Sequence, residues 1–243
     1  MKPMTIIRKA VLLLLFSLII PTSAGVYISI KEVTAPMTIY IINGCAMLAG
    51  CLFLLLIIQK SRFHLKEIGW RKGALGMWVI LILIIEAIPF IAGLNKDLSL
   101  SSFMSLCFFM VYVGMFEEGI FRGILFQYLK RINLSTAIWG SAVLFSLGHA
   151  ANLLSGKSLT LTVAQIIFAF LFGLVAAEIV ALTNSLQWVI IWHAVHNIVD
   201  QTTNVQTPVE LQMLLLSIQC VILLILAVVL WRRIRMNIFG TAS

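Results

Sequence analysis

The chain has 243 residues, of which 61% are hydrophobic and 11% charged, and its formal net charge is +8. Soluble domains are close to half apolar and a quarter charged, so this composition excludes an ordinary soluble domain and indicates a membrane protein. The basic residues lie in short connections between apolar runs and form no basic face with interleaved aromatic residues, which excludes a nucleic-acid partner.

Eight apolar windows of spanning length follow one another along the chain. They lie near residues 10–30, 37–58, 74–93, 101–129, 134–152, 159–182, 185–203 and 208–231. A helix of about 20 apolar residues crosses the hydrocarbon core, and these runs lack the period-two alternation of membrane strands. The sequence therefore predicts an all-α fold, a polytopic bundle of about eight transmembrane helices forming one membrane domain, residues 1–243.

The first window begins like a signal peptide, with basic residues and a conceivable cleavage site at 22–24. The apolar run continues through Val26, Tyr27 and Ile28, so that it is long enough to span. This continuation favours a retained first helix.

Lys and Arg are distributed unevenly over alternate connections. One side carries Lys2, Arg8, Lys9, Lys60, Arg62, Lys66, Arg71, Lys72, Lys130, Arg131, Arg232, Arg233 and Arg235, whereas the other carries Lys31, Lys96 and Lys157. Positive residues accumulate on the cytoplasmic side of membrane proteins. We therefore expect a multi-pass protein of the cell membrane with both termini cytoplasmic.

The connection 59–73 combines apolar residues with several Lys and Arg, including Arg71 beside Trp70. This pattern is typical of a basic interfacial helix on the inner leaflet, with anionic lipid as its contact. An ordinary loop anchored by one tryptophan fits the pattern equally well.

Ionisable residues inside spans cost at least about 2.5–3.5 kcal/mol each at the centre of a helix, so their presence requires a reason. The fourth span carries Glu117, Glu118 and Arg122. Glu118 and Arg122 are four residues apart on one helical face, which predicts a buried ion pair. Glu117 points elsewhere and remains available for chemistry.

Two later spans add imidazoles and an amide. The fifth carries Phe145 and His149 on one face, and the seventh carries His193 and Asn197 on one face, with His196 turned partly away. Counting about 1.5 Å per residue from the flanking loops puts these groups at comparable depths. A lone histidine in an apolar helix is usually a packed core residue, but convergence from three helices favours a site.

These groups suit hydrolysis of an acyl bond. Glu117 with His149 can take a proton from water and pass one to a leaving amine, while His193 with Asn197 can stabilise an oxyanion. In the competing arrangement Glu117, His149 and His193 bind a divalent metal such as zinc, as in a metalloprotease. The sequence has no HExxH motif, and spacing across three helices does not separate the two arrangements.

The remaining acidic residues of the spans are not assigned to the predicted site. Glu86 and Glu178 lie nearer the ends of their spans, where their carboxylates can reach the interface, and we expect them in the bundle or at the interface. Asp200 follows Asn197 by about one turn and is not assigned to the site.

The three motifs Glu-Glu-x-x-x-Arg at 117–122, Phe-x-x-x-His at 145–149 and His-x-x-x-Asn at 193–197 resemble those of the CAAX protease and bacteriocin-processing (CPBP, or Abi) membrane peptidases. The similar part is roughly 101–200. The resemblance implies an eight-helix bundle around the site, with Glu117 as general base, His149 assisting it and His193 with Asn197 as the oxyanion pair. It also implies that Glu118 and Arg122 hold the first of these helices in place.

The resemblance predicts an intramembrane endopeptidase that cleaves a membrane-associated peptide or protein, with bacteriocin processing or self-immunity as its setting. The alternative is a catalytically silent membrane scaffold or peptide-binding immunity protein with the same fold. A small transporter that relays protons through the buried acids is a third class, and the absence of an internal repeat weighs against it.

Overall fold

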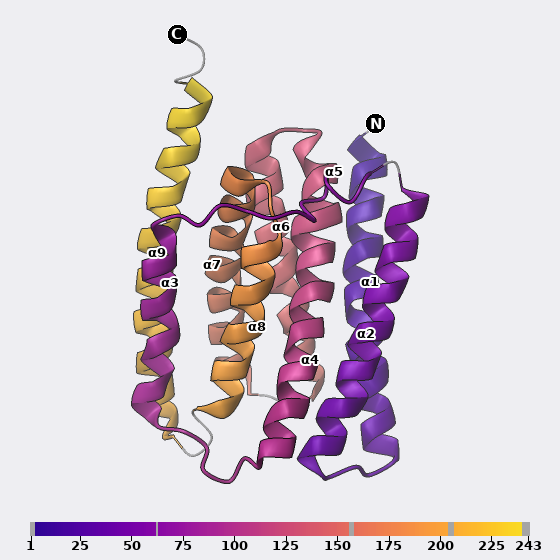
Figure 1. The fold of residues 1–243 in the computed structure, drawn as a ribbon, viewed down its shortest axis with the longest axis vertical. Coiled ribbons are helices and arrows are strands. Elements are labelled where there is room, and N and C mark those ends of the chain that lie inside the picture. Colours follow the sequence, from indigo (N-terminus) through magenta and orange to yellow (C-terminus); the bar gives the residue numbers. More distant parts are fainter. Residues whose placement is uncertain (1–2, 62, 156–157, 204–206, 240–243) are drawn as a thin grey trace.

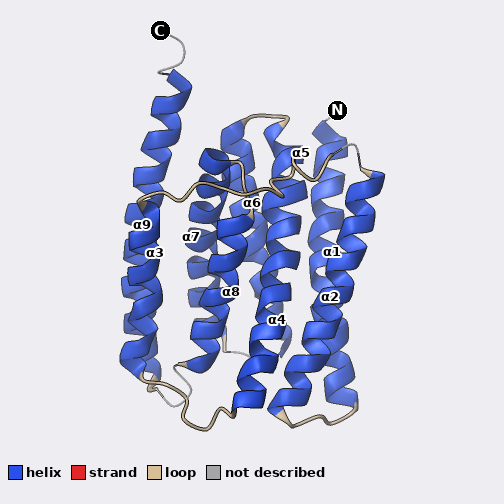
Figure 2. Ribbon diagram, in the orientation of Figure 1, coloured by secondary structure: helices blue, strands red, loops and turns tan. Residues whose placement is uncertain are grey.

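The computed structural model describes residues 3–61, 63–155, 158–203 and 207–239, and their regular elements are all helices (Figures 1 and 2). In chain order these are α1 (Pro3–Ile30), α2 (Pro36–Lys60), α3 (Trp78–Ala87), η1 (Ile88–Ala92), α4 (Leu100–Glu118), η2 (Gly119–Leu125), α5 (Phe126–Lys130), α6 (Leu134–Gly148), η3 (His149–Ser155), α7 (Leu159–Thr183), α8 (Gln187–Thr202) and α9 (Val209–Phe239). The predicted all-α bundle is confirmed.

Several of these elements join end to end, so the bundle consists of eight rods (Figure 1). Within the described residues six rods are long and apolar enough to cross a membrane: 4–30, 36–60, 100–130, 134–151, 159–183 and 209–237. The rod of α3 and η1 is shorter. The helix α8 has 16 residues, and its histidines, amide and acid make it the amphipathic member of the bundle.

The helix ends follow from local sequence. Pro36 occupies the first turn of α2, where its missing N–H breaks no helical hydrogen bond. The side chains of Ser99, Asn133 and Ser158 accept hydrogen bonds from backbone N–H groups in the first turns of α4, α6 and α7. Asn184 closes α7 in the left-handed conformation, with φ 50°.

The helix α7 is the most buried of the six long rods and packs against α6 and α9. Its residues Val175, Ala176 and Ala177 are fully buried, and these small side chains allow the neighbouring helices to approach closely. On the other side of the bundle α4 packs between α2 and α8. The polar helix α8 therefore packs against α4, which carries Glu117 and Glu118, and also contacts α3 and α7.

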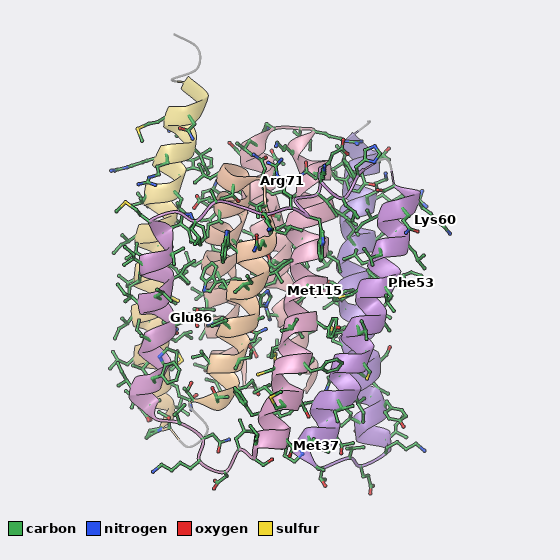
Figure 3. All side chains as sticks on the ribbon, in the orientation of Figure 1. Met37, Phe53, Lys60, Arg71, Glu86 and Met115 are labelled. Carbon is green, nitrogen blue, oxygen red and sulfur yellow. The ribbon has the colours of Figure 1, made fainter. Side chains whose placement is uncertain are left out.

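The helix α1 begins, and α9 ends, at the same end of the bundle, which we call the terminal end; the other is the distal end (Figure 1). Figure 3 shows Lys60 and Arg71 at the terminal end and Met37 at the distal end. The alternation of connections between the two ends agrees with the uneven charge distribution. Lys2, Arg62 and Lys157 lie outside the described residues.

The predicted interfacial helix within 59–73 is wrong. Residues 63–77 form turns and extended chain that cross the terminal end (Figure 1). This segment is fixed by the connection between α7 and α8: the Leu186 N–H donates to the Gly69 carbonyl (2.8 Å), and the Trp188 indole N–H donates to the Gly73 carbonyl (2.8 Å). These bonds to another segment replace the hydrogen bonds that a helix would make within itself, and Ile68 is completely buried beneath them.

Gly114 marks the closest approach of α4 and α8. A Cβ atom there would lie 2.9 Å from the backbone carbonyl oxygen of Ile190, whereas at Gly140 it would meet only the movable end of Leu129, at 3.0 Å. We expect Gly114→Ala to destabilise the protein by about 1–3 kcal/mol, the cost of overpacking. Gly140→Ala should be close to neutral. Thermal unfolding in detergent micelles measures both, and equal midpoints for the two variants would contradict this close packing.

Candidate active site

The rod from α4 to α5 contains a π-helical segment, Gly119–Leu125, directly after Glu117 and Glu118. Such wide turns occur mostly at functional sites because they rotate the following side chains out of the regular helical register. Here the segment contains Arg122, whose guanidinium Nη1 lies 2.9 Å from Oε1 of Glu118, both side chains being fully buried. The predicted ion pair is therefore present.

Arg122 is also enclosed by aromatic and small residues. Its guanidinium carbon lies 4.1 Å from the ring centroid of Phe145, a cation–π contact. A Cβ atom at Gly173 of α7 would lie 2.6 Å from the Nη2 atom of Arg122, so the glycine leaves the space that the guanidinium fills. Helices α6 and α7 thus hold the cation from the side opposite Glu118.

The two acids reach opposite nitrogens of one imidazole. Nδ1 of His193 lies 2.8 Å from Oε1 of Glu118, and its Nε2 lies 3.8 Å from Oε2 of Glu117. An ionised carboxylate paired with a guanidinium accepts hydrogen bonds only, so His193 presents its Nδ1–H to Glu118. The orientation of His193 is therefore fixed by the acid that sequence analysis had paired with Arg122 alone.

This arrangement pairs the buried charges. Arg122 pairs with Glu118, and the imidazole of His193 contacts both acids, so each charged group of Glu117, Glu118, Arg122 and His193 has a polar neighbour in the group. Pairing inside the bundle removes most of the cost of burying separate charges. We call these four residues the charge cluster.

His149 reaches the site through an aromatic ring and a cavity. Its ring and that of His193 both pack edge-on against Phe145, with centroid distances of 5.2 and 5.8 Å. A cavity of about 660 Å³ is lined by Glu117, Phe145 and His149 together with residues of α1. Phe145 thus contacts both imidazoles, Glu117 and His149 line the same cavity, and His193 approaches Glu117 from α8.

Asn197 is the candidate that the structure leaves outside these contacts. It lies one turn after His193 on α8, is half-buried, and has no hydrogen-bond partner among the described residues. Its carboxamide therefore remains available to a ligand.

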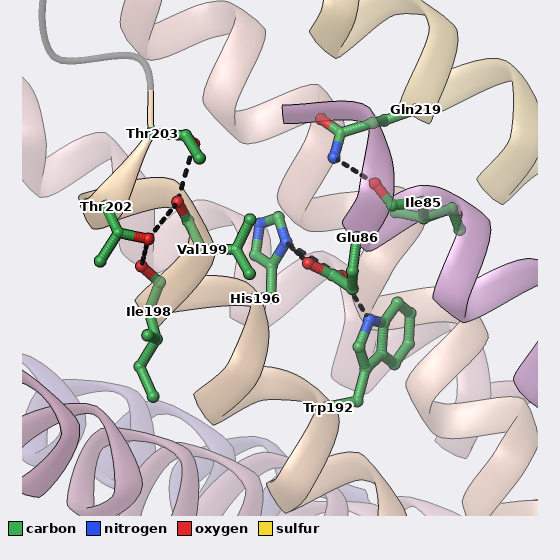
Figure 4. Close-up of polar contacts among 9 residues, drawn as sticks. All are labelled: Ile85, Glu86, Trp192, His196, Ile198, Val199, Thr202, Thr203 and Gln219. Carbon is green, nitrogen blue, oxygen red and sulfur yellow. Dashed lines mark hydrogen bonds and ion pairs between the residues drawn. The ribbon is translucent and has the colours of Figure 1, made fainter. Parts of the chain in front are cut away.

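A second polar group occupies the other side of α8 (Figure 4). The Trp192 indole N–H donates to Oε1 of Glu86 (2.8 Å), and Nδ1 of His196 lies 3.2 Å from both carboxylate oxygens. The His196 ring stacks on Phe168, with centroids 4.7 Å apart. Glu86 is thus a buried bundle residue, and sequence analysis, which treated it as close to the interface, missed its partners.

The other two acids lie apart from the site. Glu178 on α7 is 1% exposed and so lies in the bundle, which is one of the two places expected for it. Asp200, on the last turns of α8, is exposed.

The metal alternative receives no support from the arrangement of donors. Within the described residues no three side chains of His, Cys, Asp or Glu are gathered as a metal-binding group. Nδ1 of His193 is already bonded to Glu118, and only Glu117 and His149 of the three proposed ligands line the cavity. The donors in this arrangement do not fit a zinc ion, and we assign no step of the chemistry to one.

Glu117 and His149 line one cavity within the helical bundle, and His193 lies 3.8 Å from Glu117. Residues 99–199 match the family model described as type II CAAX prenyl endopeptidase, Rce1-like. This match, over less than half of the chain, confirms the resemblance to the CPBP intramembrane peptidases that the three motifs indicate. It extends from the N-cap of α4 to most of α8 and so contains every candidate site residue. Comparison with curated proteins and with solved structures gave no match.

A double-mutant cycle tests the charge cluster. Arg122→Met leaves Glu118 without its guanidinium and Glu118→Gln leaves Arg122 without its carboxylate, so each should destabilise the protein by about 3–5 kcal/mol. The double variant removes both charges of the pair and should recover part of that loss, measured as the unfolding midpoint in micelles. Additive losses would contradict charge pairing as the organising interaction.

Proposed function

We propose that this multi-pass membrane protein is an active endopeptidase that hydrolyses a peptide bond of a membrane-associated substrate at Glu117. The observation that carries the proposal is that Glu117, partly exposed to the cavity, faces an imidazole whose orientation a second acid fixes. A purely structural cluster would gain nothing from placing a carboxylate at the wall of a cavity.

The steps follow from the geometry. Glu117 accepts a proton from water, and the resulting hydroxide adds to the peptide carbonyl carbon. The oxyanion accepts a hydrogen bond from Nε2–H of protonated His193, which lies on the same side as the Glu117 carboxylate. Glu117 then passes its proton to the leaving nitrogen, the C–N bond breaks, and a carboxylic acid and an amine are released.

Four other residues assist these steps of the hydrolysis. We assign to His149, at the wall of the same cavity, a hydrogen bond that orients Glu117 or its water. We assign to the free carboxamide of Asn197 the second hydrogen bond to the oxyanion. Glu118 and Arg122 act as positioning residues, because they fix His193 and touch no substrate.

The family resemblance and the distribution of basic residues suggest the location and the biological role of the protein. We propose that the protein lies in the cell membrane with its termini cytoplasmic, and that anionic lipid contacts the basic segment 59–73. As the biological role we propose maturation of a peptide, with bacteriocin processing or self-immunity as the form that the family resemblance implies.

Glu117→Gln tests the activity while preserving side-chain shape. Removal of a general base should lower the rate about 10²–10⁴-fold, with normal insertion into the membrane. Mass spectrometry of new peptide ends in cells that produce the wild type or the variant measures the loss, and the exposed acid variant Glu210→Gln is the control. A Glu117→Gln protein that keeps full biological function would rule out the peptidase and favour the silent scaffold.

Chelation separates the general-base mechanism from the metal alternative. Because Glu117 acts directly on water in our account, prolonged dialysis against a chelator should leave the rate of cleavage by purified protein unchanged. Loss of cleavage that zinc restores would instead support Glu117, His149 and His193 as metal ligands.

A further inference from the structure

The cavity at Glu117 is asymmetric along the bundle axis. Besides the candidate residues, its wall includes Ser17, Thr22 and Ser29 of α1 and Ala151 of η3. Ser29 precedes the last residue of α1, at the distal end, and η3 follows the distal end of α6. From Ser17 to Ser29 the wall extends over about 18 Å at 1.5 Å per helical residue.

Exposure increases in the same direction. Ser17 is 7% exposed, whereas Thr22, Gly25 and Ser29 are exposed. A Cβ atom at Gly25 would meet nothing within 4 Å, so α1 is not closely covered there. The α1 wall of the cavity is therefore more exposed towards the distal end than at Ser17.

Towards the terminal end the chain is closely packed. Beyond the acids, the π-helical segment and α5 contribute side chains with 0–2% exposure: Ile120, Phe121, Ile124, Leu125 and Phe126. The segment 63–77 covers this region, with Ile68 buried and its backbone bonded to Leu186. A separate cavity of about 370 Å³ lies between residues 69–72 and α8, but neither Glu117 nor His149 lines it, so a substrate approaching from the terminal end would have to displace the packed layer.

We propose that the substrate is an extended peptide segment that enters this cavity from the distal end, which is the outer face of the membrane if the termini are cytoplasmic. This inference rests on the proposed function, since it assigns the substrate of the same site. At about 3.3 Å per residue, a cavity about 18 Å long accommodates roughly five residues of extended chain.

The chemistry of the wall supports a peptide. The backbone of an extended segment inside the bilayer has N–H and C=O groups that require hydrogen-bonding partners. Hydroxyl groups of Thr22 and Ser29 line the path to Glu117 and can both donate and accept, whereas the Ser17 hydroxyl, which donates to the Leu14 carbonyl, can accept. A volume of about 660 Å³ lies within the usual range of ligand sites.

Cysteine accessibility tests the direction of entry without requiring cleavage. The background is the full chain with its native cysteines, Cys45, Cys51, Cys107 and Cys220, replaced by alanine. The probe is a charged maleimide that does not cross membranes, applied to intact cells and to inverted vesicles. The variants are Thr22→Cys and Ser29→Cys in the cavity, Ser23→Cys as a neighbour outside the cavity lining, and Lys130→Cys at the terminal end.

We expect Thr22→Cys and Ser29→Cys to react in intact cells and Lys130→Cys to react only in inverted vesicles. Because the reactive thiolate requires water, Ser23→Cys, which faces away from the cavity, should react on the order of tenfold more slowly than Thr22→Cys. Modified Ser29→Cys should also lose the peptide ends that depend on Glu117, whereas modified Lys130→Cys should keep them.

Three outcomes would overturn the proposal: reaction of Thr22→Cys only from the side that labels Lys130→Cys, equal rates for Thr22→Cys and Ser23→Cys, or labelling of Lys130→Cys in intact cells. These results test only the direction from which the substrate enters the cavity. Failure of the peptidase itself would appear separately, as unchanged peptide ends in Glu117→Gln cells whatever the labelling pattern.

Discussion

The structure depends on how charge is accommodated among apolar helices. Two carboxylates, a guanidinium and an imidazole form one group of paired polar side chains, drawn from α4, the π-helical segment and α8. A carboxylate buried alone would be costly, but as part of this group Glu117 can be retained beside a cavity. The same pairing leaves only Glu117 facing the cavity, because Glu118 is occupied by both Arg122 and His193.

Other features of the fold follow from this requirement. The π-helical turn contains Arg122, Gly173 leaves room for its guanidinium, and Phe145 covers it while also contacting both histidines. On the opposite side of α8, Glu86 with His196 and Trp192 follows the same principle of pairing an acid with buried donors (Figure 4). The helix least suited to lipid is therefore held in place through polar contacts on two of its sides.

The sequence predicts those parts of the structure that depend on local periodicity. Apolar windows give the eight helical rods, and the spacing of four residues gives the Glu118–Arg122 pair. It does not predict pairings between distant segments: Glu118 and His193 are 75 residues apart, and Glu86 and His196 are 110 apart. Such contacts depend on the rotation of each helix about its axis, which hydropathy does not specify. The segment 63–77 was misassigned for a related reason, because its conformation is determined by bonds to the α7–α8 connection.

Hydrolysis leaves a chemical mark that tests the account most directly. One oxygen of each new carboxyl group comes from water, so membranes containing the protein can be incubated in water enriched in heavy oxygen and the released peptides analysed by mass spectrometry. We predict heavy oxygen in new carboxyl termini with the wild type and none above background with Glu117→Gln. Equal incorporation with both proteins, or none with either, would contradict the assignment of Glu117 as the base of an intramembrane peptidase.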